Sequence, residues 1–472
     1  MKRRLILLLS IVLLLHGLVS NSYAISDRNL PKNVIYHSLF EADISYLCSL
    51  IQEKKISCVE LTRYYLQRIS TYDSQFRCFI TLCNDALEIA EQRDQALANG
   101  SAKGRLFGIP MVIKDNIDYA GYRTTNGLWP YSQPKAYTSA AVVEALLNEG
   151  AVIIGKTNMA TEAQEARFSA SDAIGETFNA YDPALAAGGS SGGSAVAVSL
   201  NFASAGLGTD TNASLRYPAV LNGCVSLRPT VGLLDREGCT ILNGSRDTPG
   251  AITRSVADEA RVLDVISGGS YYPNLDAQAL KGARIGILQE LSSPTNLSSD
   301  RTSEYINKEV QQAFDNTVRE LRACGALVFH VSIPQIFDLS SKIDYGSPYK
   351  QKLMDIYTQL FEDRQLDAVI FPTYLHTPQD SLTRSGWNNI YDTPFLSNCD
   401  ELSSPLGIPE IAIPIGYHSK GAGIGLEIAA LPYQEQELLN LAYSYTCVYP
   451  HRSVPGTAPN LFEPYYEHRI PK

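Results

Sequence analysis

The sequence predicts an α/β protein whose β-sheet is largely internal. Stretches with a helical repeat of apolar residues alternate with short apolar runs of strand length, and this alternation is typical of an α/β fold. The composition is that of an ordinary globular protein, with 45% hydrophobic and 19% charged residues in a chain of 472. No solenoid repeat, low-complexity linker or clear domain boundary interrupts the chain.

The predicted elements can be taken in order. Residues 41–70 are expected to form two helices, because apolar side chains recur there every three or four residues, and Ser57 is a plausible N-cap for the second. Residues 86–98 form a third helix that ends at an Asn-Gly pair. Further helices are expected at residues 140–148, 195–203, 304–324, 352–364 and 435–445, and strands at 111–113, 151–154, 282–288, 327–331, 368–371, 411–415 and 424–428.

Both ends of the chain differ from this pattern. Residues 1–24 resemble a secretory signal: a basic start, a short apolar run and a small-x-small cleavage site at residues 22–24. An uncleaved membrane anchor is the alternative, although the apolar run is short for a span. We expect a soluble mature chain that begins near Ile25 and is secreted or periplasmic. Residues 446–472 are rich in Pro and Tyr and are expected to pack against the body as a surface tail.

Charge and cysteine content limit the function classes. The formal net charge is −10 and no run is rich in Lys or Arg, so nucleic acid and anionic membranes are poor candidate partners. The nine cysteines are an odd number, which leaves at least one thiol without an intramolecular partner. No C-x-x-C spacing occurs, so no zinc or redox site is predicted. Nothing in the sequence predicts an oligomeric state.

A candidate nucleophile site lies in two Ser-bearing loops, residues 188–194 and 206–214. A helix of small residues, 195–203, is expected between them and could bring Ser190 and Ser214 to one of its ends. Lys114 ends an earlier buried strand. A lysine there usually reaches solvent, but the chain turns back directly after it, which could direct Lys114 into a site.

Other motifs fit this region less well. The G-x-S-x-G pattern fits at Ser190 and again at Ser191, but a nucleophile elbow needs a preceding strand and a downstream Asp and His, and residues 179–185 resemble a turn. The histidines available downstream are His330, His376, His418, His451 and His468. The dinucleotide fingerprint fails at Thr211, and residues 188–194 lack the end of a phosphate-binding loop.

Three separated segments together resemble the amidase signature family. They are Val-Ile-Lys-Asp-Asn around Lys114, Gly-Gly-Ser-Ser-Gly-Gly-Ser at 188–194, and Gly-Thr-Asp-Thr-x-x-Ser-x-Arg at 208–216. Shorter matches occur at residues 108–110, 124–127, 155–159, 247–250, 253–258, 371–373, 407–409 and 414–416. The resemblance implies one large α/β amidase domain at residues 25–472, with a mixed central sheet covered by helices, and no metal or organic cofactor.

The resemblance also implies a Ser-Ser-Lys triad. Ser214 would be the nucleophile, Ser190 a relay in a cis peptide bond, and Lys114 the base, since burial lowers the pKa of a lysine. The oxyanion hole would be formed by backbone N–H groups of Thr211, Asn212, Ala213 and Ser214. Asp210 and Arg216 are expected to brace this loop as an ion pair rather than to act in catalysis.

One departure from the family concerns Asn212 and Ala213, which replace the usual Gly-Gly pair. If those positions need a positive φ, Ala would cost about 1 kcal/mol there. A catalytically impaired binding protein therefore remains an alternative to an active amidase. The expected substrate is a linear carboxamide: a peptide amide, an acyl amide or a small amide. The segment 374–392, with Trp387 and Tyr391, is a candidate wall of the acyl pocket. The family's glutamyl-tRNA amidotransferase subunit is disfavoured by the signal sequence.

Overall fold

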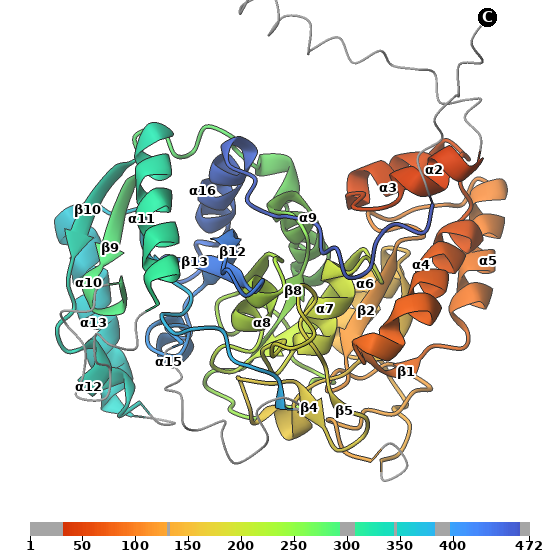
Figure 1. Ribbon diagram of the computed structural model, residues 1–472, viewed down its shortest axis with the longest axis horizontal. Coiled ribbons are helices and arrows are strands. Elements are labelled where there is room, and N and C mark those ends of the chain that lie inside the picture. The colour runs from red at the N-terminus through yellow and green to blue at the C-terminus, as the bar shows by residue number, and fades with distance from the viewer. Residues whose placement is uncertain (1–31, 130–132, 293–306, 344–346, 383–396, 463–472) are drawn as a thin grey trace, which may run out of the picture.

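Two mixed β-sheets extend across the computed structural model, with helices on their faces (Figure 1). The structure describes residues 32–129, 133–292, 307–343, 347–382 and 397–462. The sheets adjoin at strands β7 and β8, where Val225 and Thr253 exchange two backbone hydrogen bonds of 2.8 and 2.9 Å. The predicted α/β class and the mixed central sheet are therefore confirmed.

The first sheet has five strands and carries the motif-bearing segments. Its central strand, β2, runs parallel to both of its neighbours, whereas the outermost strands are antiparallel to theirs. Every residue of β2, β3 and β6 is buried, as a parallel core requires. The strand order is β1 (Phe79–Leu82), β3 (Val152–Thr157), β2 (Pro110–Lys114), β6 (Ala205–Asp210) and β8 (Thr248–Ile252).

The second sheet has six strands. Strand β9 is parallel to β10 and β11, and the remaining pairs are antiparallel. The strand order is β10 (Leu327–Val331), β9 (Arg284–Leu288), β11 (Ala368–Pro372), β13 (Gly423–Ala429), β12 (Glu410–Tyr417) and β7 (Ser226–Arg228). A separate hairpin-like pair consists of β4 (Ala170–Ser171) and β5 (Gly175–Glu176).

The helices cover both sheets, and their ends follow local capping signals. Ser57 and Glu60 form the capping box that starts α4, which confirms the predicted N-cap. Around the first sheet lie α2 (Lys32–Ser38), α3 (Ile44–Gln52), α4 (Cys58–Tyr72), α5 (Ala86–Ala98), α6 (Ala141–Asn148), α7 (Gly192–Ser199) and α9 (Val256–Ser267). Around the second lie α8 (Arg216–Leu221), α10 (Gln289–Ser292), α11 (Lys308–Ala323), α12 (Ile336–Ser340), α13 (Pro348–Arg364), α15 (Ser403–Leu406) and α16 (Glu435–Val448).

The prediction for residues 206–214 was wrong in part. These residues were expected to be a loop, but strand β6 runs to Asp210 in the middle of the first sheet. Gly208 lets this strand approach the start of α7, since a Cβ on it would lie 2.7 Å from Ser191 Oγ. Here glycine marks close packing of a helix on a strand rather than a turn.

Other boundaries differ for identifiable reasons. Helix α13 starts four residues earlier than predicted, because Ser347 caps it and Pro348 occupies its first turn. Strand β8 was missed because Pro249 and Gly250 lie inside it. The predicted helix 304–324 is seen from Lys308, and residues 304–306 lie outside the described residues.

The chain after α16 packs back on the body as predicted, as far as residue 462. Arg68 donates hydrogen bonds of 2.8 and 2.9 Å to the carbonyl oxygens of Ala458 and Pro459. Residues 463–472 and the predicted signal at 1–24 lie outside the described residues. Across the part of the chain that is described, we find no helix with the length and hydropathy that crossing a bilayer requires.

Candidate active site

Lys114 ends strand β2 with its side chain fully buried in the molecule. Its Nζ donates to Ser190 Oγ at 2.6 Å and to Thr209 Oγ1 at 2.9 Å. Burial lowers the pKa of Lys114 to about 7, outweighing the opposite effect of nearby Asp210 and Asp247. The side chain therefore points into the molecule, as the turn after the strand predicted, and can lose its proton near neutral pH.

The turn after Lys114 is held by a second buried lysine. Lys156, on the adjacent strand β3, lies 3.3 Å from the Asp115 carboxylate, and both side chains are fully buried. Lys156 also donates to the carbonyl oxygen of Arg123 and to Thr124 Oγ1, each at 2.7 Å. The Thr125 N–H donates to Asp115 at 3.1 Å. These bonds fix the backbone that directs Lys114 toward Ser190.

The Ser190 loop, residues 188–191, connects to α7 through tightly packed backbone. The Gly189–Ser190 peptide bond is cis, as the family resemblance implies. Ser169 Oγ lies 3.0 and 3.1 Å from the carbonyl oxygens of Gly188 and Ser190, and accepts from the Gly192 N–H at 2.7 Å. A Cβ on Gly189 would lie 2.3 Å from a backbone carbonyl oxygen, so only glycine fits this position.

Ser191, the other candidate in this loop, is bound to backbone. Its hydroxyl donates to the carbonyl oxygen of Thr209 at 3.2 Å. Among the described residues no histidine bonds Ser190 or Ser191, and His376 instead contacts Tyr217 and the carbonyl oxygen of Thr377. His468 lies outside the described residues. The described residues thus do not assemble a Ser-His-Asp elbow.

Ser214 lies just before α8, next to the Ser190 loop. The Ser191 N–H donates to the carbonyl oxygen of Ser214 at 3.2 Å, so the two serine-bearing loops touch. The Ser214 side chain is buried, and within the described residues its hydroxyl makes no hydrogen bond, to Ser190 or to any other group. The structure therefore brings Lys114 and Ser190 into direct contact and places Ser214 on the adjoining loop.

The Ser214 loop, residues 211–214, presents free backbone donors. Across the described part of the chain, the four N–H groups of this loop have no hydrogen-bond acceptor. Neither Asn212 nor Ala213 has a positive φ. The cost expected for Ala213 therefore does not arise, because this backbone does not use the left-handed region that favours glycine.

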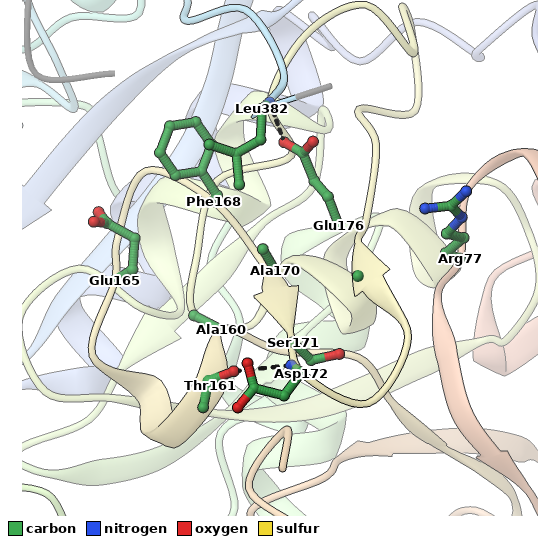
Figure 2. A pocket seen from close by; sticks show the side chains of 11 residues that line it. Arg77, Ala160, Thr161, Glu165, Phe168, Ala170, Ser171, Asp172, Glu176 and Leu382 are labelled. Carbon is green, nitrogen blue, oxygen red and sulfur yellow. Dashed lines mark hydrogen bonds between the residues drawn. The ribbon is translucent and has the colours of Figure 1, made fainter. Parts of the chain in front are cut away.

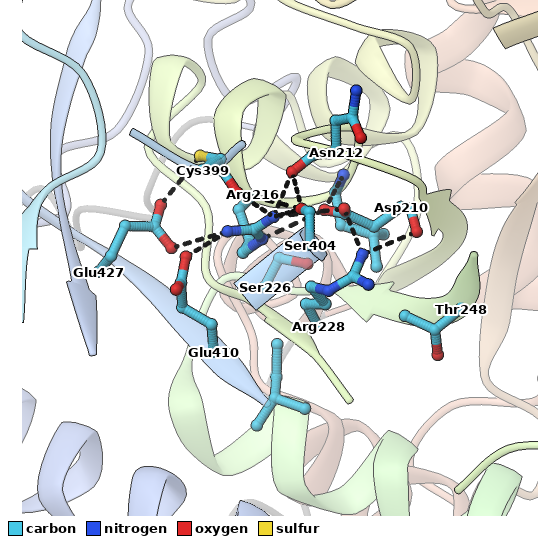
Figure 3. Close-up of polar contacts among 12 residues, drawn as sticks. Asp210, Asn212, Arg216, Ser226, Arg228, Thr248, Cys399, Ser404, Glu410 and Glu427 are labelled. Carbon is cyan, nitrogen blue, oxygen red and sulfur yellow. Dashed lines mark hydrogen bonds and ion pairs between the residues drawn. The ribbon is translucent and has the colours of Figure 1, made fainter. Parts of the chain in front are cut away.

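Asp210 and Arg216 brace this loop, as predicted. The Asp210 carboxylate accepts from Arg216 at 3.2 Å, from Arg228 at 2.7 Å and from the Leu215 N–H at 3.0 Å (Figure 3). Burial raises the pKa of Asp210, but the two guanidinium groups and the Leu215 bond hold it down to about 2. The Asp210 carboxylate accepts four hydrogen bonds from three residues, so it is ionised and held in place.

Several residues of this region were missed from the sequence. Thr209 Oγ1 accepts from both Lys114 and Asn116 at 2.9 Å, and both residues lie inside the recognised motifs, so their position was a usable signal. Ser169 and Ser404 are isolated hydroxyls with no local pattern. Arg246 donates to Asn212 Oδ1 at 3.1 Å from a loop 34 positions away.

A pocket of about 450 Å³ lies beside strands β4 and β5 (Figure 2). One lining residue, Ala160, connects the pocket to the Ser190 loop, because its N–H donates to the Ser190 carbonyl oxygen at 3.3 Å. Its lining mixes apolar Phe168 and Leu382 with charged Arg77 and Glu176. The three triad candidates do not line this pocket. Trp387 and Tyr391, the candidate wall of the acyl pocket, lie outside the described residues.

Two further observations concern cofactors and thiols. Within the described ranges, no group of three His, Cys, Asp or Glu side chains is placed to hold a metal ion. All nine cysteines lie in the described residues, and all are free thiols.

Comparisons with known proteins agree over most of the chain. The model of the Amidase family matches residues 60–348. A mandelamide hydrolase of Pseudomonas putida is 28% identical over 479 residues, covering 86% of this chain and 90% of that protein. A glutamyl-tRNA(Gln) amidotransferase subunit from Caldanaerobacter subterraneus is 29% identical over 500 residues, covering 88% and 98%. The crystal structure of native peptide amidase from Stenotrophomonas maltophilia superposes with a TM-score of 0.77 at 27% identity, covering 89% of this chain and 99% of that one.

Proposed function

Because the chain belongs to the amidase signature family, whose members hydrolyse amide C–N bonds, we propose that Ser214, Ser190 and Lys114 carry out this hydrolysis. The single observation that carries the proposal is the 2.6 Å contact between Lys114 Nζ and Ser190 Oγ, with the Ser214 loop packed alongside. A lysine whose pKa is lowered to about 7 by burial supplies the base that a serine nucleophile needs.

The proposed reaction moves one proton along the three side chains. Neutral Lys114 accepts a proton from Ser190, which accepts one from Ser214 as Ser214 Oγ attacks the amide carbonyl. The free N–H groups of the Ser214 loop stabilise the resulting oxyanion. The proton returns through Ser190 to the leaving nitrogen as the C–N bond breaks, and water then cleaves the ester. For the relay to operate, the Ser214 hydroxyl must turn toward Ser190 and donate a hydrogen bond to it. Catalytic hydrogen bonds of this kind often form only when substrate is bound.

The variants Lys114→Met, Ser190→Ala and Ser214→Ala test these roles directly. With a carboxamide that the wild type hydrolyses, each variant should release ammonia at a rate at least about 10²-fold below that of the wild type. Circular dichroism and thermal melting should show that the variants remain folded. A Ser214→Ala protein with wild-type turnover would refute the assignment. A wild type that binds amides without turnover would favour the binding-protein alternative.

The proposed substrate is a linear carboxamide: a peptide amide, an acyl amide or a small amide. Relatives named mandelamide hydrolase and peptide amidase support this class. Release of ammonia or amine from a panel with these three kinds of amide, at equal concentration, measures the preference. Turnover only with glutaminyl donors in the presence of tRNA and partner proteins would instead favour the amidotransferase activity named for another relative.

We also propose that the chain is exported, on the pattern of residues 1–24. In a bacterial host, the mature protein should be found in the periplasmic or culture fraction with an N-terminus near Ile25. Recovery of a chain that still begins at Met1 in the cytoplasm would refute this proposal, and recovery in the membrane fraction would indicate an uncleaved anchor.

A further inference from the structure

A group of buried charges from both sheets lies behind the Ser214 loop (Figure 3). We call it the Arg216 cluster. Each of its side chains has no exposed surface. Its members come from strands β6, β7, β12 and β13 and from helix α8, and they are Asp210, Arg216, Arg228, Glu410 and Glu427.

The register of the second sheet directs two acids of this cluster to one face. Glu410 pairs with Arg228 across strands β12 and β7, and with Ala429 across β12 and β13. Glu427 precedes Ala429 by two residues on β13, so its side chain is on the same face as that of Glu410. Both carboxyl groups converge on one guanidinium: Arg216 Nη1 donates to Glu410 Oε1 and lies 3.6 Å from Glu427 Oε2.

The other arm of Arg216 reaches the Ser214 loop. Arg216 Nη2 donates to the carbonyl oxygen of Asn212 at 2.5 Å, and Ser404 Oγ donates to the same oxygen. A peptide unit is planar, so fixing the carbonyl of Asn212 also fixes the direction of the Ala213 N–H. The two glutamates therefore act, through Arg216, on one of the free donors of the loop.

The balance of charges indicates a proton in the cluster. Two guanidinium groups face three carboxyl groups, and one excess charge in the interior is costly unless it is neutralised. Glu410 Oε2 and Glu427 Oε2 are buried and have no hydrogen bond among the described residues, although the two carboxyls are within bonding reach of each other. One proton shared between the two carboxyl groups would give the pair a hydrogen bond and balance the charge.

The surroundings agree with a proton on this pair. Burial, followed by the neighbouring Glu427, raises the pKa of Glu410 well above its usual value of about 4.5 despite Arg216. Asp210 stays ionised, because its guanidinium partners lower its pKa to about 2. Among the residues that the structure describes, the other titratable groups near the pair or Arg216 are Tyr357, Cys399 and Asp400. Cys399 Sγ donates to Glu427 Oε1 at 3.4 Å, which leaves Oε2 free to share the proton.

We propose that Glu410 and Glu427 are positioning residues for the Ser214 loop: they share one proton and hold Arg216, which orients the Ala213 N–H. This inference rests on the proposed function, because the N–H it orients serves the oxyanion. The pair does not touch the substrate or the reacting atoms. Its effect on the rate is exerted through Arg216 and the Asn212 carbonyl.

The test compares three variants by the rate at which a fluorophosphonate probe labels Ser214, since its phosphoryl oxygen needs the same N–H donors. In the single variants Glu410→Gln and Glu427→Gln, the pair still has one carboxylate and one hydrogen-bond donor. The probe should therefore label Ser214 in each of them at close to the wild-type rate. The double variant leaves no carboxylate opposite Arg216 Nη1 and should label at least about tenfold more slowly. With a carboxamide that the wild type hydrolyses, the kcat of the double variant should fall in the same proportion while its KM stays nearly constant.

Glu259→Gln is the matched control. Glu259 is a buried carboxyl that accepts from the Leu227 N–H at 3.0 Å and from Thr253 Oγ1 at 2.9 Å, and burial raises its pKa to about 8. In the described part of the chain Glu259 has no bond to the Ser214 loop, so this variant should label like the wild type. A double variant that labels at the wild-type rate would overturn the proposal. If a single variant is labelled as slowly as the double variant, the two carboxyl groups do not share a proton and that part of the proposal is wrong. A wild type that does not label would instead refute the proposed function.

A second readout does not depend on folding of the double variant. The infrared difference spectrum between wild type and Glu410→Gln at pH 7 should show the loss of one protonated, buried carboxyl band. The Glu427→Gln variant should lose the same band, because the proton belongs to the pair. If neither single variant changes this band, no proton is shared between the two carboxyls and the proposal is wrong.

Discussion

At the scale of single residues, the role proposed for Lys114 predicts how the reaction depends on pH. The family motif predicted its role as a base, and the structure adds its contacts with Ser190 and Thr209. A base acts only after losing its proton, and burial lowers the pKa of Lys114 to about 7. We therefore expect kcat/KM to rise as the pH increases through about 7 and then to level off. Lys114→Met should abolish that rise and lower the rate by about 10²–10⁴-fold.

The measurement is a pH profile of ammonia release at substrate concentrations well below KM. Ser191→Ala is a suitable control, because its hydroxyl bonds only to the Thr209 backbone and lies outside the proposed relay. A wild-type profile that is flat between pH 6 and 9 would contradict the assignment of Lys114 as the titrating base.

A second prediction for a single residue concerns the replacement of Ala213 by glycine. The family's usual glycine suggests that Ala213→Gly should improve the site, but the backbone here does not adopt a positive φ. Ala213 is also fully buried, so its methyl group contributes to packing. We expect the glycine variant to lower the free energy of unfolding by about 1 kcal/mol with no gain in kcat. Urea unfolding and turnover of the same preparation test this, and a clear gain in kcat would show that the alanine impairs the site.

At the scale of elements, the motifs occupy the ends of secondary structures that pack against one another. Strand β2 carries Lys114 at its end, the Ser190 loop starts helix α7, and strand β6 leads into the Ser214 loop. Strands β2 and β6 are parallel neighbours with α7 packed on them. Lys114 and Ser190 meet across 76 positions because this unit fixes their distance.

Strands β12 and β13 give a prediction for stability. The pKa of Glu410 is raised in the folded state, so the folded protein holds a proton that the unfolded chain loses above about pH 4.5. The free energy of unfolding of the wild type should therefore fall as the pH rises above that value. Glu410→Gln cannot lose this proton, so its stability relative to the wild type should increase with pH.

Urea unfolding of both proteins at pH 5 and pH 8 provides the measurement. Glu362 on α13 is exposed, and Glu362→Gln serves as a control for the loss of a surface carboxylate. A difference between wild type and Glu410→Gln that is the same at both pH values would contradict the raised pKa.

At the scale of the whole molecule, the sequence was sufficient for the fold class and for the order of most elements. Helix α5 has the predicted bounds, because its apolar repeat and its Asn-Gly stop are local signals. The two sheets, and their junction at Val225 and Thr253, were not predictable in the same way. Strand order depends on pairing between distant segments, and short strands such as β7 carry too few residues to show a period.

In the candidate site too, local motifs could be predicted from the sequence and long-range contacts could not. Lys114, Ser190 and Ser214 belong to local motifs and could be named from the sequence. The support behind them could not: Arg216 meets Glu410 across 194 positions, and that contact depends on the register of the second sheet. Ser169 and Ser404 are single hydroxyls that donate to backbone oxygens of distant segments, so no residue pattern marks them.

In the proposed reaction, Ser214 attacks the amide and Lys114 activates Ser214 through Ser190. The most direct test is mass-spectrometric mapping of the serine labelled by a fluorophosphonate probe at pH 8. We expect the label on Ser214 in the wild type, no label in Ser214→Ala, and strongly slowed labelling in Lys114→Met. A label found on Ser190 or Ser191 that persists at the same rate in Lys114→Met would contradict the proposed reaction.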